Sequence, residues 1–516
     1  MNSIRLVNIR SLVDSGPVRI APITVLVGQN SSGKSTFVRF FPLLRQTAEV
    51  LAREPLLWFG RFVDFGSAEE AASRIGSAGP FGFDVTFDIE KASIINRRRG
   101  LFSYRASQTK DPAQTAVTVA IRYLGPQGDR KQYEFKLSFL DHEIVLQIND
   151  SLVVKLRINN VDYSDITQGK LFVSTWSSCF PNLFFRDEGG PDSDPFSRQI
   201  IGYTRTNTHG KSQTDRVAHL ARSLMQAPLD NVLAYVTHPP GADSIWQRTT
   251  HYWTPETSSF KKLRDWIIGT RIPEIVQIAG SVFSKRCAQV RYITPIRASA
   301  ERYYRMQGLA LGEIDPQGQN VAMFLHNLPA VDKQRFMAWM NEHFGYAVDT
   351  VATPGHISMV IRDPNEQSGL ASVNLADTGF GFSQMIPIII QIWTLLNSRG
   401  TALRTLTTTT TVVAIEQPEL HLHPRLQAVL ADLFSQAVKL ARESGIDLRL
   451  VIETHSEQII NRLGRRVSES KLAPEDISVV LFDKPGFALP TSVTATKFDK
   501  DGFITNWPYG FFESNN

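Results

Sequence analysis

A glycine-rich loop between an apolar strand and a helical stretch carries the clearest chemistry in the chain. It matches the pattern G-x-x-x-x-G-K-[ST] and is called the P-loop below. Glycines let consecutive backbone N–H groups point at phosphate oxygens, and the helix N-terminus adds a partial positive charge. In this arrangement Lys34 reaches the β- and γ-phosphates and the Ser35 hydroxyl reaches Mg²⁺. The pattern therefore predicts a site for ATP and Mg²⁺ at Gly28, Gln29, Asn30, Ser31, Ser32, Gly33, Lys34, Ser35 and Thr36.

A second chemical element is an apolar strand that ends in acidic residues. Thr411–Ile415 is followed directly by Glu416-Gln417-Pro418-Glu419. A carboxylate at the C-terminal end of a buried parallel strand lies where nucleotide sites open in such sheets. We expect Glu416 to hold Mg²⁺ through water, together with Ser35. The alternative is a strand that ends at an ordinary polar turn, and the P-loop upstream makes this alternative less favoured.

A third strand pattern, Leu448–Ile452, leads into Glu453-Thr454-His455-Ser456. A histidine at this position can hydrogen-bond the γ-phosphate and sense whether it is present. A histidine that only makes structural hydrogen bonds is the alternative for His455. Because the P-loop and the acidic strand end are also present, we favour a γ-phosphate sensor at His455.

A fourth segment, Asp377–Gln384, precedes the apolar helical pattern Met385–Leu396 and is called the signature segment below. It places glycines and a serine at a helix start, which is typical of an anion-binding helix N-terminus. A simple helix-capping loop explains the same residues equally well. The candidates in this segment are Gly379, Gly381, Ser383 and Gln384.

Taken in order, these four motifs resemble those of the ABC-type ATPases of the SMC, RecF and OLD group. The motifs cover roughly residues 1–70 and 290–516, and the acidic strand end continues as Leu-His-Leu-His-Pro424. Weaker matches are Tyr292–Arg297, Glu301–Tyr304 and the closing segment from Asp501. Within the group, the chain is most similar to stand-alone bacterial members of phage defence, the PtuA-type subunits of Septu and retron-linked systems.

The resemblance implies an ATPase head that binds ATP between two copies, so that Ser383 of one protomer contacts the γ-phosphate held by Lys34 of its partner. A homodimer or a higher homo-oligomer follows. Two residues depart from the family pattern. The glycines Gly379 and Gly381 precede the serine instead of following it, and Gln417 occupies the position of the usual catalytic glutamate. The candidate catalytic residues are therefore Gln417, Glu419 and His455, and hydrolysis is expected to be slow.

The resemblance also implies a role as an ATP-dependent switch that controls a separate effector, such as an HNH nuclease. The alternatives are a RecF-like DNA repair or recombination ATPase and a scaffold that binds ATP without turnover. OLD-type proteins carry a nuclease domain after the head, whereas 61 residues follow His455 here. We therefore expect no nuclease domain in this chain.

The elements that position these motifs predict an α/β fold, with an ABC-type P-loop ATPase head built from both ends of the chain. We expect residues 1–90 and 291–516 to form the head and residues 91–290 to form an inserted α+β region. Between Val117 and Ile158 the apolar residues alternate, which predicts antiparallel strands and a hairpin at Asn149–Ser151. A loop is expected over residues 186–216, with helices over 217–225 and 262–268.

Composition sets the outer limits on function. The 516 residues are 42% hydrophobic and 20% charged, with two cysteines, which predicts a soluble cytoplasmic protein of ordinary globular type. The longest apolar stretch, Met385–Trp393, is broken by Pro387 and Gln391, so we expect no membrane partner. The net charge of +5 permits contact with DNA or RNA. The candidate contacts are Arg97, Arg98 and Arg99, with Lys91, Arg122 and Arg130 nearby, and an ordinary solvated face is the alternative.

Overall fold

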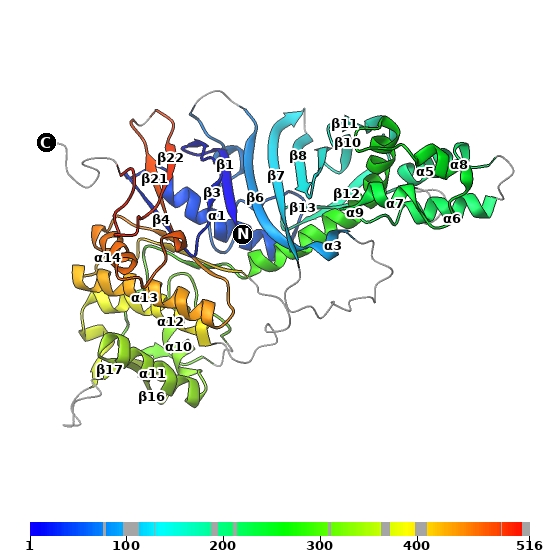
Figure 1. Cartoon of the computed structure of the whole chain (residues 1–516). Helices are drawn as coiled ribbons and strands as arrows, with labels where there is room; N and C mark the ends of the chain where they lie inside the picture. Colours follow the sequence, from blue (N-terminus) through cyan, green and yellow to red (C-terminus); the bar gives the residue numbers. More distant parts are fainter. Residues whose placement is uncertain are drawn as a thin grey trace. The chain divides into compact units, whose positions relative to one another are not determined.

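The computed structural model describes residues 1–75, 79–95, 113–127, 130–186, 194–209, 214–307, 311–362, 372–397, 410–486 and 488–507. The chain folds into two compact units, and each combines segments that are distant in sequence (Figure 1). The first unit holds Met1–Ile9, Leu44–Trp58 and Gly66–Ala288. The second holds Arg10–Leu43, Phe59–Phe65 and Gln289–Asn516.

The second unit is built on a mostly parallel sheet with the order β14-β19-β20-β4-β21-β22. Among the described strands of this sheet, β22 is antiparallel to its neighbour and the other pairs are parallel. The strands at its centre are apolar and buried on both faces, as parallel strands covered by helices require. The strands predicted before the P-loop, at Thr411–Ile415 and at Leu448–Ile452 are confirmed, as is the α/β fold class. The bounds of the six strands are β4 Ile23–Gly28, β14 Arg291–Ile293, β19 Thr411–Glu416, β20 Leu448–Glu453, β21 Ile477–Asp483 and β22 Ser492–Thr496.

Parallel pairing brings the chemical motifs to one edge of this sheet. Glu416 is the register partner of Glu453, and β20 pairs in turn with β4, the strand that precedes the P-loop. Helix α1 (Lys34–Ala48) starts inside the P-loop. Helix α13 (Pro424–Glu443) packs against β20 and β4, and α14 (Glu457–Ser468) packs against α13. The carboxyl ends of β4, β19 and β20 therefore meet beside the first turn of α1.

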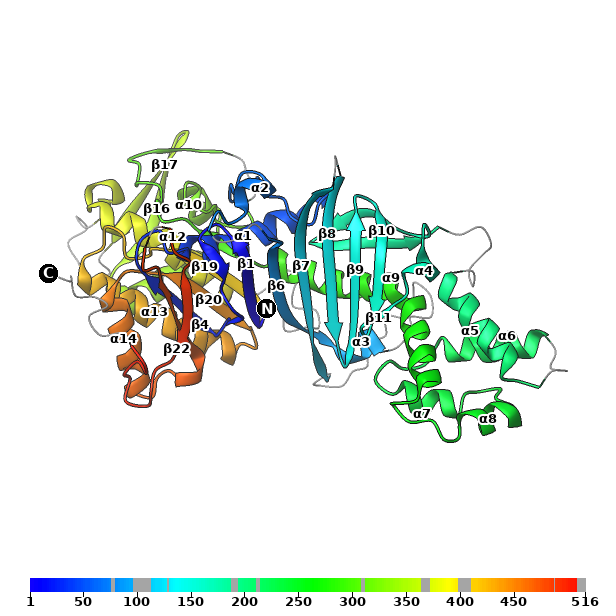
Figure 2. The same cartoon turned by 90° about the horizontal axis from the view of Figure 1, so that it is seen from above.

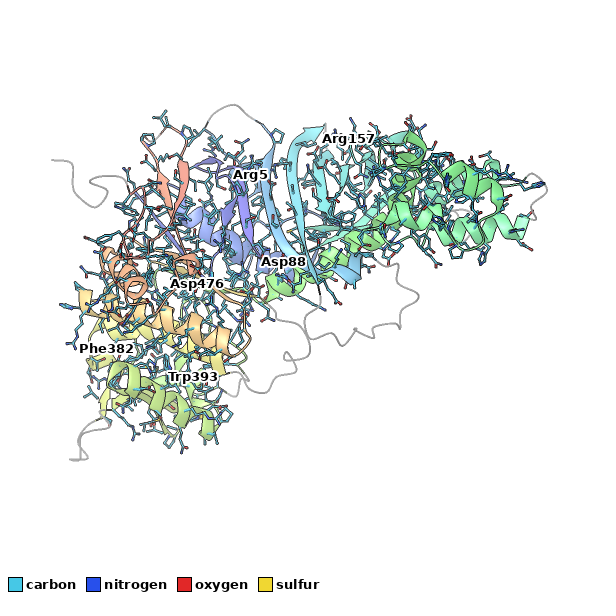
Figure 3. The ribbon with its side chains drawn as sticks, in the orientation of Figure 1. Arg5, Asp88, Arg157, Phe382, Trp393 and Asp476 are labelled. Carbon is cyan, nitrogen blue, oxygen red and sulfur yellow. The ribbon has the colours of Figure 1, made fainter. Side chains whose placement is uncertain are left out.

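A small antiparallel sheet and three helices complete the second unit. The sheet has the order β15-β17-β16, with β18 beside β17. Figure 3 labels Phe382 and Trp393, which lie on the apolar helix α12 (Phe380–Asn397). The Trp393 ring lies 5.2 Å from that of Phe336, and the Phe382 ring 5.1 Å from that of Tyr346, between ring centres. The remaining bounds are β15 Tyr304–Arg305, β16 Ala347–Thr353, β17 His356–Arg362, β18 Ser372–Asn374, α10 Val321–His326 and α11 Ala330–Phe344.

The first unit is dominated by an antiparallel sheet with the order β13-β12-β10-β9-β8-β7-β6-β1. The alternation of buried and partly exposed residues along these strands confirms the predicted antiparallel sheet, and β9 and β10 form the predicted hairpin. Helix α9 (Ser258–Ala288) packs along this sheet against β6, β10 and β13 (Figure 2). The strand bounds are β1 Ser3–Ile9, β6 Phe81–Glu90, β7 Gln114–Gln127, β8 Arg130–Phe139, β9 His142–Asn149, β10 Leu152–Ile158, β12 Leu171–Ser177 and β13 Phe180–Phe185.

The loop predicted over residues 186–216 is wrong for much of its length, because α5 (Pro195–Thr206) is a helix and α6 (Thr214–Leu224) begins before 217. Asp194 caps α5 by accepting hydrogen bonds from the N–H groups of Phe196 and Ser197, both at 3.0 Å. Pro195 at the first helical position fits the same start. The Asp-Pro pair therefore marks a helix N-terminus, and burial of Phe196 holds the helix in the unit.

Helix α9 is longer than predicted, because the expected stretch 262–268 is only part of a 31-residue helix. Its buried residues continue far beyond 268 and pass Pro273. Within the described ranges, no helix is both long and apolar enough to span a membrane. Shorter elements are β2 Leu12–Asp14, β3 Val18–Arg19, β5 Leu51–Ala52, α2 Ala68–Ala71, α3 Lys91–Ile95, β11 Val161–Asp162, α4 Ser164–Thr167, α7 Val232–Thr237 and α8 Ser244–Thr250.

Candidate nucleotide-binding site

The P-loop forms one wall of a cavity of about 540 Å³ in the second unit. This is within the usual size of small-molecule sites. Two glycines make the loop possible. A Cβ at Gly28 would collide with the backbone carbonyl of Phe482, and a Cβ at Gly33 would lie 2.6 Å from Ser11 Oγ. The residues lining the cavity are Arg10, Ser11, Asn30, Ser31, Ser32, Gly33, Lys34, Ser35, Thr36, Gln417, Glu453 and His455.

Polar groups in the P-loop are arranged for an anion. The Lys34 ammonium is buried and donates to the carbonyl oxygens of Gly28 at 2.9 Å and Gln29 at 2.6 Å. Burial lowers the pKa of Lys34, while the carboxylates of Glu453 and Glu419 oppose this shift. The Ser32 hydroxyl is buried, and no hydrogen-bond partner lies within reach among the described residues. These groups fit a phosphate, which accepts hydrogen bonds from each of them.

Ser35 and Glu416, the predicted magnesium pair, have different hydrogen-bond partners. Glu416 accepts two hydrogen bonds from Arg39, at 2.8 and 2.9 Å, and a third from the Tyr292 hydroxyl at 2.6 Å. Arg39 lies one helical turn after Ser35 on α1, and its pKa is raised mainly by the hydrogen bonds to Glu416. The charge of the Glu416 carboxylate is therefore already balanced inside the protein.

Ser35 instead donates a hydrogen bond to Glu453 Oε1 at 2.8 Å. The other carboxylate oxygen, Oε2, is buried and has no hydrogen-bond partner in the described part of the chain. Burial, and then the neighbouring charge of Glu416, raise the pKa of Glu453 to about 7. A hydroxyl and an orphaned carboxylate oxygen are the hard oxygen donors that Mg²⁺ prefers, so the residues present fit this ion.

Among the three candidate catalytic residues, Gln417 and His455 line the cavity. Gln417 has a positive φ of 42°, which is uncommon for a residue other than glycine, and its N–H donates to the Glu453 carbonyl at 2.8 Å. Partial burial, and then Lys34, lower the pKa of His455, which favours a neutral imidazole. Glu419 accepts hydrogen bonds from the Thr454 hydroxyl at 2.8 Å and from the backbone N–H of His455 at 2.7 Å. Burial raises the pKa of Glu419.

The signature segment presents exposed and buried parts. Asp377 and Gly379 are exposed, and Gly379 has a φ of 86° just before α12 begins. Ser383 and Gln384 are buried in the first turns of the helix. The exposed surface of this segment therefore comes from the loop before the helix, with Asp377 paired to Arg302 at 2.5 Å.

Two arginines for which the sequence motifs predict no role also belong to this region. Arg10 lines the cavity and stacks on the Phe65 ring, 4.4 Å from its centre. Arg297, the last residue of the Tyr292–Arg297 match, is buried and donates from Nη2 to the Gln417 carbonyl at 3.2 Å. Its own carbonyl accepts a hydrogen bond from Gln384 Nε2 at 3.2 Å. Burial lowers the pKa of Arg297 to about 10. Its place at the end of a weak motif was the only sequence signal for it.

Comparison with known proteins gives a family match for part of the chain. The model described as the AAA ATPase domain matches residues 331–460, which include the signature segment, the acidic strand end and His455. No curated protein matches the chain. Together with the P-loop cavity, the family match supports an ATPase.

Solved structures with a similar arrangement are SMC head domains. The head domain from Thermotoga maritima is 9% identical over 96% of this chain and 97% of that chain, with a TM-score of 0.31. The Smc head from Pyrococcus furiosus, with an extended coiled coil and bound to the C-terminal domain of ScpA, is 9% identical over 96% of both chains, with a TM-score of 0.30. At these TM-scores the likeness adds nothing to the assignment of function.

Proposed function

We propose that this chain is an ATP-driven switch that binds Mg²⁺–ATP in the P-loop cavity, hydrolyses it slowly and changes its assembly state with the bound nucleotide. The observation that carries this proposal is the cavity itself. The P-loop, Gln417 and His455 line the same cavity. A phosphate chain held by Lys34 and Ser32 places its terminal phosphate toward the carboxyl ends of β19 and β20.

Slow hydrolysis follows from the side chain at position 417. A neutral amide cannot take a proton from the attacking water, although its carbonyl oxygen can orient that water. Glu419 does not line the cavity, and both of its oxygens already accept hydrogen bonds. Bound ATP would then persist and act as a structural clamp between heads.

The resemblance to phage-defence ATPases supports a cytoplasmic role in which the ATP-bound assembly restrains or releases a separate effector, such as an HNH nuclease. Two copies of the chain are proposed to meet through the exposed loop of the signature segment. DNA or RNA is a proposed trigger, and the arginines at 97–99 that suggested it lie outside the described residues.

Nucleotide binding and turnover test the first part of the proposal. Wild type should bind ATP and hydrolyse it slowly, with a burst-free progress curve and a long-lived ATP-bound species in light scattering. Asp377→Arg adds bulk and positive charge at the exposed loop and should abolish ATP-dependent association while ATP still binds. Lys500→Ala, an exposed change elsewhere in the second unit, is the matched control. Failure of wild type to bind ATP would contradict the proposal.

The defence role is tested in cells. The gene and its genomic neighbours should protect bacteria from phage, and the Lys34→Ala change should remove that protection while Lys500→Ala keeps it. Purification with the neighbours should recover an effector protein. Protection that is unaffected by Lys34→Ala would contradict an ATP-driven switch.

A further inference from the structure

The Glu453 carboxyl group is a buried acidic group at the edge of the P-loop cavity. Its residue is 2% exposed, and in the described parts of the chain no salt bridge reaches it. Lys34 donates its hydrogen bonds to the backbone carbonyls of Gly28 and Gln29, and its charge acts on Glu453 without an ion-pair contact. Among the described residues, the Ser35 hydroxyl is the hydrogen-bond partner of the Glu453 carboxyl group, through Oε1, and Oε2 is left without a partner. Burying a charge without a contacting partner is costly, and a cation at Oε2 would offset that cost.

The neighbouring carboxylate has the opposite arrangement. Glu416 and Glu453 are register partners on adjacent parallel strands, so their side chains lie side by side at the same edge. Three donors from Arg39 and Tyr292 already hold Glu416, and its side chain is 2% exposed. The two-point contact from Arg39 and the Tyr292 hydroxyl occupy three of the roughly four acceptor sites of the Glu416 carboxylate, so little capacity is left for a cation as a direct ligand.

We propose that Glu453, together with Ser35, holds the divalent cation of the bound nucleotide, and that Arg39, Glu416 and Tyr292 form a fixed brace beside it. This inference rests on the proposed nucleotide site. It moves the cation from the end of β19 to the end of β20, one strand closer to the P-loop strand. The oxygen-only donor set selects Mg²⁺ or Mn²⁺ over ions that prefer nitrogen or sulfur.

Two consequences separate this arrangement from one in which Glu416 holds the ion. Replacement of Glu453 by glutamine removes a cation ligand but leaves no charged group unpaired. Replacement of Glu416 by glutamine leaves the Arg39 guanidinium without its anionic partner. It therefore destabilises the contacts among Arg39, residue 416 and Tyr292 rather than the cation site. Glu453→Gln should therefore lose cation binding and Glu416→Gln should lose stability, although each removes one negative charge from the same edge of the sheet.

The experiment measures the affinity for a fluorescent ATP analogue with Mg²⁺ and with EDTA, for wild type, Glu453→Gln and Glu416→Gln, with thermal unfolding of each protein. Electron paramagnetic resonance of Mn²⁺ in the presence of ATP reports the ion directly. In EDTA we expect Glu453→Gln to bind the analogue as wild type does. In Mg²⁺ this variant should lack the increase in analogue affinity that wild type shows, and its Mn²⁺ affinity should fall on the order of 10- to 100-fold. Glu416→Gln should keep most of the Mg²⁺-dependent increase in affinity and unfold at a lower temperature.

The inference is overturned if Glu453→Gln keeps the full gain from Mg²⁺, or if Glu416→Gln loses it equally. If Glu453→Gln does not fold, Glu453→Asp decides, because a shortened carboxylate should weaken Mn²⁺ binding when it is a ligand and leave it unchanged when it is not. Wild type that binds no nucleotide in either buffer refutes the proposed function itself, which is a separate outcome.

Discussion

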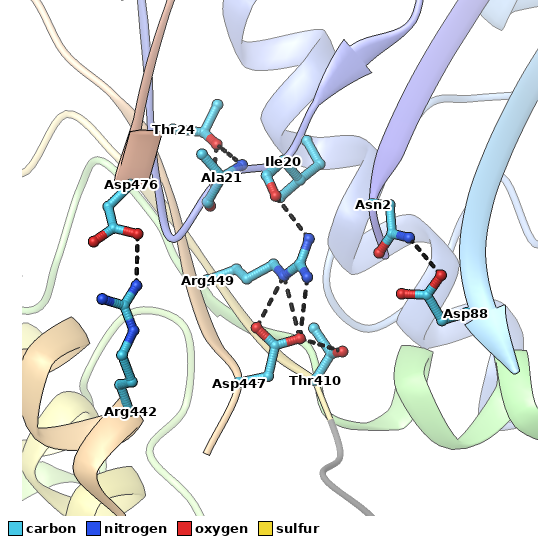
Figure 4. A network of polar contacts seen from close by, with 10 residues as sticks. All are labelled: Asn2, Ile20, Ala21, Thr24, Asp88, Thr410, Arg442, Asp447, Arg449 and Asp476. Carbon is cyan, nitrogen blue, oxygen red and sulfur yellow. Dashed lines mark hydrogen bonds and ion pairs between the residues drawn. The ribbon is translucent and has the colours of Figure 1, made fainter. Parts of the chain in front are cut away.

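The two ends of strand β20 show opposite ways of placing charge. At its start, Asp447 accepts hydrogen bonds from Arg449 and from the Thr410 hydroxyl, and Arg449 also donates to the Ile20 carbonyl at 2.7 Å (Figure 4). At its end, Glu453 keeps a buried oxygen without a partner. The polar side chains at the start of β20 are satisfied within the chain. Polar groups left unsatisfied beside a cavity are where a ligand completes the structure.

The backbone at the cavity edge is also constrained. Gln417, which follows β19, has a positive φ of 42°, and its backbone groups form hydrogen bonds with Glu453, Arg297 and Leu420. Such conformations cost energy and persist where surrounding contacts enforce them. The surrounding contacts therefore hold the cavity edge in place.

The largest effect is expected from Lys34→Ala, which removes the cation of the P-loop. The direct contact to the phosphates contributes roughly 1.5–3 kcal/mol, so ATP affinity should fall about 10- to 150-fold and turnover should vanish. Isothermal titration with ATP measures the first effect and phosphate release the second. The unfolding temperature should remain near that of wild type. Unchanged ATP affinity would refute the P-loop assignment.

The second-largest effect is expected from placing a general base at position 417. Gln417→Glu supplies a proton acceptor at the cavity wall, and general-base catalysis contributes on the order of 10²–10⁴-fold. We expect a higher rate of hydrolysis and a shorter-lived ATP-bound assembly, measured under single-turnover conditions. Glu419→Gln should change the rate little. If wild type hydrolyses ATP rapidly and Glu419→Gln stops this hydrolysis, Glu419 is the base and the proposal of a long-lived ATP clamp is wrong.

A smaller change in rate is expected at Arg297, which positions Gln417 through its backbone carbonyl. Arg297→Met should lower the hydrolysis rate about tenfold, equivalent to about 1.4 kcal/mol, with little change in ATP affinity. Arg297→Lys should restore part of the rate, because it keeps one donor and the charge. Equal losses of rate and affinity in both variants would indicate a general structural role instead.

The smallest effect on function is expected at the opposite end of β20. Arg449→Met leaves Asp447 without its main partner and should lower the free energy of unfolding by about 1–3 kcal/mol, measured by chemical denaturation, while ATP affinity stays unchanged. Burial acts to raise the pKa of Asp447, but Arg449 outweighs it and holds the pKa below its usual value. The stabilising contribution is therefore present above the ordinary aspartate pKa, about 3.9, and is lost as the pH falls. The difference between wild type and Arg449→Met should narrow in acid.

The three strands that carry the site in the second unit were predictable because their signals are local. Ile23–Val27, Thr411–Ile415 and Leu448–Ile452 are short apolar runs bounded by glycines or polar residues, and all three are strands. The P-loop pattern likewise contains its own turn chemistry. Helix α5 was missed because a capping Asp-Pro pair has the same composition as a loop until the buried Phe196 is seen.

The partners inside the site could not be predicted in this way. The bond between Ser35 and Glu453 joins residues 418 positions apart and depends on which strand lies next to β4. The bonds from Arg39 and Tyr292 to Glu416 likewise depend on long-range pairing. Sequence spacing predicted an acidic strand end beside the P-loop, and the order of the strands decides which of two acidic ends faces Ser35.

The most direct test of the account is the position of the metal ion in a structure of the protein with Mn²⁺ and a non-hydrolysable ATP analogue. Anomalous scattering locates Mn²⁺ independently of the other atoms. The account predicts one peak beside the Ser35 hydroxyl and the Glu453 carboxylate, with the contacts from Arg39 and Tyr292 to Glu416 intact. A peak beside Glu416, with Arg39 displaced and Glu453 turned away, would contradict it.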